Sequence, residues 1–312
     1  FDVILSRPCT YGVFSGPLGG FAPRPKLCVG CLRCTVQHPD FVQVLPNPDL
    51  FEIGDSYTTP GHITAIDEEA RKGMVPVRGQ GYRGRFGGPG FDGMLTDMSE
   101  IVRPSRDGIH GRELIGTAVD IGGKPMHLSF DKQGNLSGQT PEMFTIQVPF
   151  IFDLPPGNLG SESLHRVLEE TSRNIDTLTC IDADSVTKLG LDLPNVVPVL
   201  DISDASQIGR FPNSRMIEIS SWDRDAFERA RLSTDSVIGV RIEFVEGWQD
   251  SLTEAVRSGA TVIHLLANLH GEDRQGRFVT DLFKEAHLLL IEQGRRDLVT
   301  LIGSGGIVGA DH

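Results

Sequence analysis

The sequence predicts an α/β fold in which parallel strands alternate with helices, as in a (β/α)8 barrel that is truncated after its seventh strand. Between Phe144 and Gly306, seven short apolar runs alternate mostly with segments of helical periodicity. Strands that are apolar on both faces are typical of a parallel sheet covered by helices. The seventh run leads into Gly303-Ser304-Gly305-Gly306, a glycine turn at the place where barrels often bind a cofactor phosphate. Seven such units therefore favour a barrel over an open sheet.

Each strand is expected where a short run of β-branched and other apolar residues lies between turn or helix signals. The expected strands are Thr145–Phe152, Leu178–Ile181, Val196–Leu200, Met216–Ile219, Val237–Phe244, Val262–Leu266 and Leu298–Ile302. The expected helices are Ser161–Ile175, Asp223–Arg231, Gln249–Arg257 and Val279–Gln293. The first helix should begin at the N-cap Ser161 and bury Leu164, Val167 and Leu168. The last should bury Leu282, Phe283, Ala286, Leu289 and Leu290.

Composition divides the chain into three expected parts. Residues 1–50 are rich in Gly, Pro and Cys and predict a compact, ferredoxin-like module held by something other than an apolar core. Residues 51–142 are Gly-rich and charged, and predict a connecting arm with one short helix at Asp67–Lys72. Residues 143–312 hold the predicted barrel. Because the chain begins with Phe1 and ends six residues after Gly306, we expect a fragment of a larger protein.

The net charge of the chain argues against two classes of binding partner. A net charge of −13 and a pI near 5.1 argue against nucleic acid and anionic membranes as main partners. We find no apolar run near the roughly 20 residues that a membrane helix needs, and no charged-then-apolar secretory leader. The expected location is the cytosol.

Three cysteines follow one another at a spacing typical of metal binding. In Cys28-x2-Cys31-x2-Cys34 the thiolates can face one centre, which predicts three corners of an iron–sulfur cluster. The fourth ligand is expected to be Cys9, which would complete an all-thiolate set, with His38 as the other candidate. A structural zinc ion and unliganded thiols are the alternatives. Cys180 lies within an apolar run and is expected to be a buried apolar side chain.

Active residues of barrels follow the carboxyl ends of the strands. The residues at those positions are Asp153, Asp182, Asp201, Ser220, Arg241, the loop His270–Arg277 and the turn Gly303–Gly306. Arg241 lies inside an otherwise apolar strand and should point into the top of the barrel. There it could stabilise a reduced flavin, which needs a nearby cation, or form a structural ion pair. His270 is the best-placed general acid.

Several stretches resemble a known family. Val237–Phe244, Gly271–Gly276 and the segment from Glu285 to Gly306 are similar to the FMN-binding barrel of glutamate synthase and its relatives. Val75–Gly122 resembles glutamate-synthase-like FMN proteins with an N-terminal cysteine module. The resemblance implies an oxidoreductase that reduces the imine of 2-oxoglutarate and ammonia to glutamate.

The resemblance also implies site residues. It places the FMN phosphate on Gly303, Ser304, Gly305 and Gly306, and a basic residue, here Arg241, beside the flavin. It puts cofactor contacts in the strand-one turn that contains Asp153. That turn is Gly/Ser-rich in the family but is Asp153-Leu-Pro-Pro-Gly-Asn158 here, and Gly271–Gly276 is poorer in glycine than usual. Electrons would pass to the flavin through the cysteine module. Ammonia would come from solution or from glutamine. The expected partners are therefore an amidotransferase subunit, which would release ammonia from glutamine, and a reductase subunit.

Two other functions remain open from the sequence. The altered turn after strand one favours a non-catalytic subunit that relays electrons or acts as a scaffold in a larger complex. A barrel that binds another phosphorylated ligand without redox chemistry is a third interpretation.

Overall fold

A computed structural model describes residues 9, 11–14, 24, 27–28, 30–43, 45, 48–54, 58–73, 117–124, 129–137, 142–155 and 159–307. The chain divides into two compact units, one of Phe1–Gly111 with Ile307–His312 and one of Arg112–Gly306. Most of the stretch Val75–Gly122 that carries part of the family resemblance lies outside the described residues. The boundaries of the three predicted parts remain a prediction.

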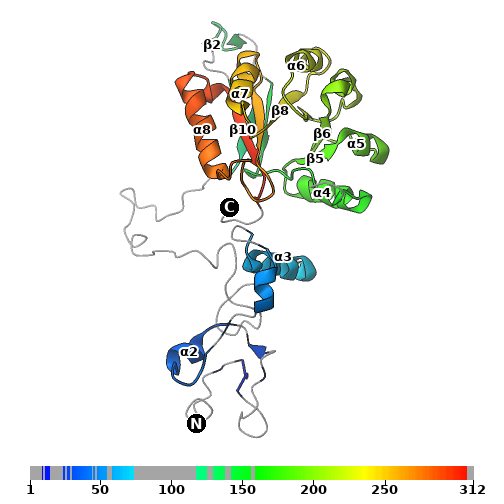
Figure 1. Ribbon diagram of the computed structural model, residues 1–312. Coiled ribbons are helices and arrows are strands. Elements are labelled where there is room, and N and C mark those ends of the chain that lie inside the picture. The colour runs from blue at the N-terminus through cyan, green and yellow to red at the C-terminus, as the bar shows by residue number, and fades with distance from the viewer. Residues whose placement is uncertain are drawn as a thin grey trace. The chain divides into compact units, whose positions relative to one another are not determined.

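The helices described in the first unit are α2 (Arg33–Gln37), the 3-10 helix η2 (Pro48–Glu52) and α3 (Pro60–Lys72). In Figure 1, α2 is blue and α3 is closer to cyan. The short helix expected at Asp67–Lys72 begins seven residues earlier, at Pro60. Thr59 and His62 form a reciprocal capping box there, and Pro60 occupies the first turn, where proline is well tolerated.

The second unit is built on a six-stranded parallel sheet. Its strands follow one another in the order β5 (Thr179–Asp182), β6 (Val196–Leu200), β7 (Met216–Ile219), β8 (Val237–Glu243), β9 (Val262–Leu266) and β10 (Thr300–Ser304). Every neighbouring pair is parallel. Phe152 forms a parallel bridge with Thr179 and so occupies a seventh strand position beside β5.

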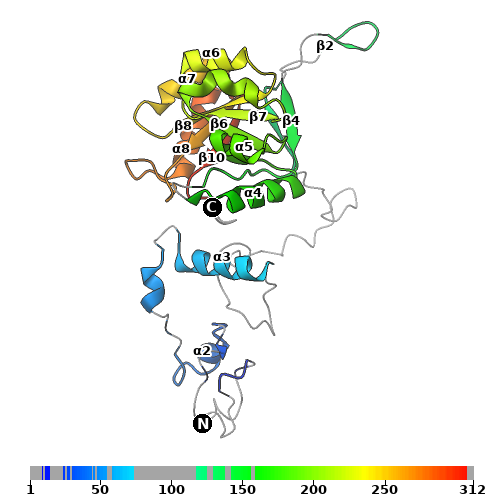
Figure 2. The same ribbon diagram turned by 90° about the vertical axis from the view of Figure 1, so that its right-hand side faces the viewer.

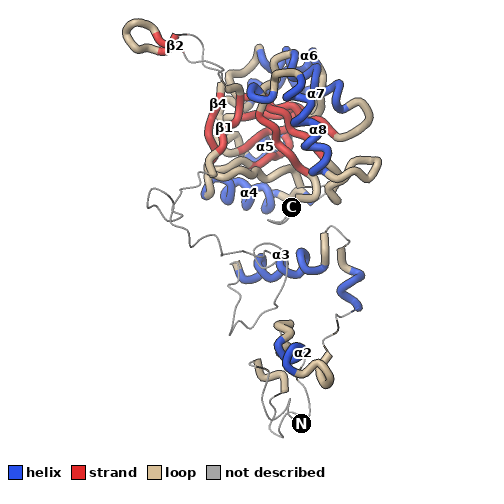
Figure 3. The backbone as a smooth tube through the Cα atoms, turned by 90° about the vertical axis from the view of Figure 1, so that its left-hand side faces the viewer, coloured by secondary structure: helices blue, strands red, loops and turns tan. Residues whose placement is uncertain are grey.

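Helices connect these strands and cover the outside of the curled sheet. They are α4 (Glu162–Asn174), α5 (Ala183–Leu189), the 3-10 helix η5 (Ile202–Arg210), α6 (Arg224–Arg231), α7 (Trp248–Arg257), α8 (Val279–Glu292) and the 3-10 turn η6 (Arg296–Leu298). Figures 2 and 3 show the strands gathered at the centre of this unit with helices around them. The fold is therefore a mixed α/β half-barrel, which agrees with the truncated barrel expected from the sequence.

Two apolar clusters lie on the two faces of the sheet. The larger joins outward-facing residues such as Ile217, Ile219 and Val240 to helix residues that include Leu252 and Leu282. The smaller contains the inward-facing residues Cys180, Val197, Met216, Val237, Val262 and Ile302. Because successive side chains of a strand point to opposite faces, each strand contributes to both clusters.

An antiparallel pair of strands packs against the inner cluster. β1 (Val119–Gly122) pairs with β4 (Met143–Ile146), and Ile121 and Ile146 are buried among the inward-facing residues. Thr300 at the start of β10 contacts this pair: its hydroxyl accepts a hydrogen bond from the Gly122 N–H and lies 3.2 Å from the Gly122 carbonyl oxygen. A further hairpin joins β2 (Ser129–Phe130) to β3 (Leu136–Ser137).

The structure corrects the prediction for the first strand. Thr145–Phe152 is not continuous, because β4 ends at Ile146 and only Phe152 joins the parallel sheet. The intervening segment contains Pro149, which has no N–H to donate to a neighbouring strand. The β4 residues pair instead with β1, which comes from the Gly-rich part of the chain.

The buried face of the first predicted helix is also different. α4 begins after the expected N-cap Ser161, whose hydroxyl accepts from the Leu164 N–H. Its buried residues are His165, Glu169 and Ser172, whereas Val167 is 57% exposed. Leu164 and Leu168, which were expected to be buried, are half-buried. The Asn195 side chain donates to the Glu169 carbonyl and to the Ser172 hydroxyl, so hydrogen bonds help to hold this face.

Within the described ranges, no helix is long and apolar enough to cross a membrane.

Candidate active site

Five polar side chains meet inside the curled sheet. They are Asp153, directly after Phe152, with Cys180 of β5, Glu218 of β7, Arg241 of β8 and His264 of β9. The four strand residues occupy inward-facing positions, and Asp153 follows directly on the bridge at Phe152. We number the strand positions from the one that contains Phe152. The second, fourth and sixth positions then supply Cys180, Glu218 and His264. The first and fifth supply Asp153 and Arg241. Alternate strands of a parallel barrel supply the members of each interior layer.

These groups form one continuous network, which we call the interior cluster. Nη1 of Arg241 donates to Oε2 of Glu218 at 2.7 Å, and Nη2 donates to Oδ1 of Asp153 at 2.7 Å. Nδ1 of His264 lies 2.9 Å from Oε1 of Glu218. The Cys180 Sγ lies 3.8 Å from Oε2 of Glu218. Glu218, Cys180 and His264 are completely buried, and Arg241 is 5% exposed.

A glycine makes room for the central carboxylate. Gly239 of β8 is paired in register with Glu218 of β7. A methyl group at Gly239 would lie 2.6 Å from Cε of Met216 and 2.9 Å from Cγ of Glu218. The missing side chain at Gly239 therefore lets Glu218 enter the interior beneath Arg241.

The network keeps its acid and its guanidinium charged. Burial by itself would raise the pKa of Glu218, but His264 and Arg241 outweigh it and lower the pKa to about 2. Burial by itself would lower the pKa of the Arg241 guanidinium, but Glu218 and Asp153 outweigh it and raise that pKa above its ordinary value. Buried charges persist only when they are paired in this way. At neutral pH the cluster thus holds an ionised glutamate and a protonated arginine.

Three members of the cluster were not singled out as site residues. The sequence did carry a signal for Glu218 and His264, since each is the one polar residue in a buried apolar strand. Cys180 is buried in the inner apolar cluster, as expected, and its Sγ also lies 3.8 Å from the Glu218 carboxylate. Burial raises the pKa of the Cys180 thiol well above its ordinary value, and Glu218 and Asp153 add to the effect.

The predicted glycine turn follows β10. Ala267 donates to the Ser304 carbonyl at 2.9 Å, so the turn lies against the segment that follows β9. Gly305 and Gly306 have φ values of 104° and 69°, which side-chain-bearing residues rarely adopt. A methyl group at Gly305 would collide with the Ala267 carbonyl and lie 2.7 Å from the Asn268 carbonyl oxygen.

Gly303 has a different local role from its neighbours. A methyl group at this position would lie 2.6 Å from Cε2 of Phe283, a residue of α8. The glycine therefore lets the aromatic ring pack closely on β10 from the helix side. Its predicted part in phosphate binding remains a prediction, as do those of Ser304, Gly305 and Gly306.

The other residues predicted at the strand ends lie outside the interior cluster. Asp182 caps α5, where its carboxylate accepts from the Ser185 N–H at 2.8 Å. His270 is exposed on the loop between β9 and α8, and its backbone N–H donates to the Asn268 side chain. The structure brings together Asp153 and Arg241 of the predicted set, and it does not bring His270 to them.

The loop between β9 and α8 is organised around Asp273. One carboxylate oxygen accepts from the N–H groups of Gln275 and Arg277 at 2.8 and 2.9 Å, and the other accepts from Nε of Arg277 at 2.8 Å. Burial works to raise the pKa of Asp273, but these hydrogen bonds prevail and lower it. The ionised carboxylate therefore stabilises this loop, which passes next to the glycine turn.

This lowered pKa predicts a pH dependence of the loop. A lowered folded-state pKa stabilises the folded loop above the ordinary Asp range, and the effect is lost as pH falls through the folded value. We expect hydrogen-exchange protection of the Gln275 and Arg277 amides to stay constant from about pH 7 to 5 and to fall below about pH 4. Asp273→Asn should show weaker protection with no such pH dependence. Equal protection in the wild type at pH 7 and at pH 3 would contradict the assignment.

The predicted cluster cysteines lie in the first unit. Cys28 and Cys31 are exposed, Cys9 is partly exposed, and Cys34 lies in the first turn of α2. Burial raises the pKa of Cys34, and the nearby Cys31 and Cys28 raise it further. Whether they hold a metal, and whether Cys9 or His38 is the fourth ligand, remains a prediction.

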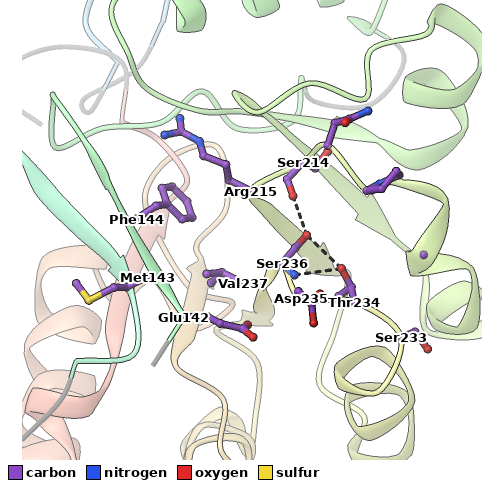
Figure 4. Close-up of a pocket in the computed structure, with 13 residues that line it drawn as sticks. Glu142, Met143, Phe144, Ser214, Arg215, Ser233, Thr234, Asp235, Ser236 and Val237 are labelled. Atoms are coloured by element: carbon purple, nitrogen blue, oxygen red, sulfur yellow. Dashed lines mark hydrogen bonds between the residues drawn. The ribbon is translucent and has the colours of Figure 1, made fainter. Parts of the chain in front are cut away.

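A separate surface pocket of about 570 Å³ lies at the opposite ends of the strands (Figure 4). It is lined by residues just before β7 and β8, including Ser214, Arg215 and Ser236, and by Phe144 of β4. The Arg215 guanidinium lies 4.8 Å from the centre of the Phe144 ring. The Ser236 hydroxyl donates to the Ser214 carbonyl at 2.7 Å. The amino ends of barrel strands usually serve stability, so this pocket is not our candidate for catalysis.

Comparison with known proteins gives one informative match. No family model matches the chain, and no solved structure matches it significantly. The chain is 28% identical over 155 residues to the archaeal-type glutamate synthase (NADPH) of Dehalococcoides mccartyi. The aligned region covers 50% of this chain and 30% of that protein, so the chain corresponds to less than a third of its relative's length. The similarity supports a distant relationship to the glutamate synthase-like family.

Proposed function

We propose that this chain is part of an FMN-dependent oxidoreductase of the glutamate synthase type. It would reduce the imine formed from 2-oxoglutarate and ammonia. The observation that carries the proposal is the glycine turn at the carboxyl end of β10, in a half-barrel from a chain related to archaeal-type glutamate synthase. The carboxyl ends of barrel strands are where such enzymes bind their cofactors and substrates.

The residues of the turn fit the phosphate of FMN. Backbone N–H groups bind phosphate well where glycines allow the chain to curve closely around it. Gly305 and Gly306 both have positive φ values, and the turn leaves no space for a side chain at Gly305. Within the proposal, the backbone from Gly303 to Gly306 holds the phosphate and so fixes the position of the flavin ring.

Arg241 could contact the flavin ring with only part of its guanidinium, because two carboxylates already bind it. Its bonds to Glu218 and Asp153 use two of the five N–H groups of the guanidinium. An oxygen of the flavin ring can accept from another. The positive charge is shared with two carboxylates, so Arg241 also positions Asp153 at the end of the first strand. Bound FMN would supply the hydride for the imine.

The remaining parts of the proposed reaction come from the loops and the first unit. His270, exposed on the loop after β9, is the proposed proton donor to the substrate nitrogen. Cys28, Cys31 and Cys34, with Cys9 or His38, are proposed to hold the iron–sulfur cluster that passes electrons to the flavin. The name of the Dehalococcoides relative specifies NADPH, which makes NADPH the electron donor to test first.

The test is made on the intact protein, purified without oxygen. Its absorption spectrum is recorded, and FMN and iron are quantified. Glutamate formation is then followed with NADPH, 2-oxoglutarate and ammonia. We expect flavin bands, a broad shoulder from the cluster, and glutamate production that requires all three substrates.

Each result has a defined meaning. Flavin with iron and glutamate formation supports the proposal as a whole. Flavin without iron leaves the FMN enzyme but removes the cluster from it. A protein that contains neither flavin nor iron would contradict the proposal.

One observation favours a second candidate function, a non-catalytic subunit that relays electrons. Asp153 stands where the family has a Gly/Ser-rich turn, and its carboxylate is bound to Arg241 and to the Leu154 N–H. This contact occupies part of the region that touches substrate in the family. Flavin and iron without any glutamate formation would favour the relay over the enzyme.

A further inference from the structure

Three side chains of the interior cluster are arranged like the ligands of a metal ion. Potential ligand atoms of Asp153, Cys180 and His264 all lie within 4.8 Å of one another. They come from three separate strand positions that the sheet brings together. Cys180 and His264 are fully buried, and Asp153 lies at the more open side of the group.

The orientation of His264 points to a ligand between these groups. Its Nδ1 lies 2.9 Å from Oε1 of Glu218, an acceptor, so Nδ1 is the donor of this contact and Nε2 is the ring nitrogen that remains to bind a ligand. Nε2 is buried and has no hydrogen-bond partner among the described residues. A carboxylate on one ring nitrogen and a metal on the other is the usual arrangement of a metal-binding histidine.

The distance across the group leaves room for an ion between the two side chains. Nε2 of His264 lies 3.9 Å from Oδ2 of Asp153, which is too long for a hydrogen bond. Two atoms bound tetrahedrally to one zinc ion stand about 3.3–3.8 Å apart, given bond lengths of about 2.0–2.3 Å. A small inward movement of either side chain meets that requirement.

We infer that Asp153, Cys180 and His264 form a site for one zinc-like divalent cation, with Glu218 as the positioning residue for His264. Thiolate, imidazole and carboxylate together suit zinc, and three protein ligands leave a fourth position open. Binding replaces the proton of the Cys180 thiol, which is released to solvent. The inference does not rest on the proposed flavin chemistry.

The test must separate this site from the N-terminal cysteines. In intact protein carrying Cys28→Ser, Cys31→Ser and Cys34→Ser, we expect about one zinc ion per chain. Cobalt should give a thiolate-to-metal absorption band at the same stoichiometry. Cys180→Ser and His264→Gln, each added to this background, should remove the band and lower the bound zinc below about a tenth of an ion per chain.

The matched control is His165→Gln, a buried histidine of α4 that lies outside the cluster. It should keep both the band and the zinc. Circular dichroism checks that each variant is folded. If the background variant does not fold, cadmium-113 NMR of the wild type distinguishes a one-thiolate site from a site with several thiolates.

A folded background variant without metal, or one that keeps its band after Cys180→Ser or His264→Gln, overturns the inference. Absence of a one-thiolate cadmium signal in the wild type does so as well. Loss of FMN with the zinc retained would instead count against the proposed function alone, so the two failures are distinguishable.

Discussion

Replacing Glu218 with alanine is expected to lower the free energy of unfolding by about 3–5 kcal/mol, because it leaves the buried charge of Arg241 with only the partly exposed Asp153 as its partner. The carboxylate accepts from Arg241 at 2.7 Å and from His264 at 2.9 Å, with no exposed surface of its own. Arg241 would lose one of its two carboxylate partners, and Nδ1 of His264 would lose the carboxylate beside it. Urea unfolding followed by circular dichroism measures the change.

A surface pair provides the control. Glu162 and Arg166 are separated by one helical turn of α4, form an ion pair at 3.1 Å, and are both more than half exposed. Glu162→Gln should cost less than about 0.5 kcal/mol. If Glu218→Ala does not fold, the double variant Glu218→Met with Arg241→Met should recover stability, because it removes both buried charges. A Glu218→Ala protein as stable as Glu162→Gln would contradict the structure of the interior cluster.

Replacing Gly305 with alanine is expected to weaken FMN binding at least about tenfold, which corresponds to about 1.4 kcal/mol. The residue has a φ of 104°, and an added methyl group would collide with the Ala267 carbonyl. The turn must move away from the end of β9 to relieve that contact. The FMN dissociation constant, measured by flavin fluorescence on the intact protein, reports the effect.

Gly294 offers a matched control for this substitution. It also has a positive φ, of 61°, but nothing lies within 4 Å of an added methyl group. Gly294→Ala should therefore cost about 1 kcal/mol of stability from the backbone conformation alone and leave FMN affinity unchanged. An equal loss of FMN affinity in both variants would show that the turn has no special part in binding.

The parallel strands could be predicted closely from the sequence. β6, β7 and β9 begin and end at the residues expected from their apolar runs, because a strand buried on both faces needs apolar residues throughout. The first strand could not be predicted in this way. Its residues pair with β1, a partner from a Gly-rich segment whose own pattern is weak.

The site could be predicted only in part, for a related reason. Arg241 was recognisable as a charge inside an apolar strand. The same pattern marks Glu218 and His264, but their meaning depends on which strands become neighbours, and that is a property of the folded sheet. Cys180 gives no signal, since a buried cysteine in a strand looks the same whether it packs against methyl groups or against a carboxylate.

The contact between β1 and β10 has a consequence for the order of folding during synthesis. The N–H of Gly122 and the hydroxyl of Thr300 that accepts from it are 178 positions apart in the chain. Ile121 and Ile146 therefore leave the ribosome long before Ile302, one of the residues that cover them. Such high contact order slows folding and leaves apolar strands transiently uncovered. The nascent chain consequently has a prolonged interval in which chaperone binding to this segment is favoured.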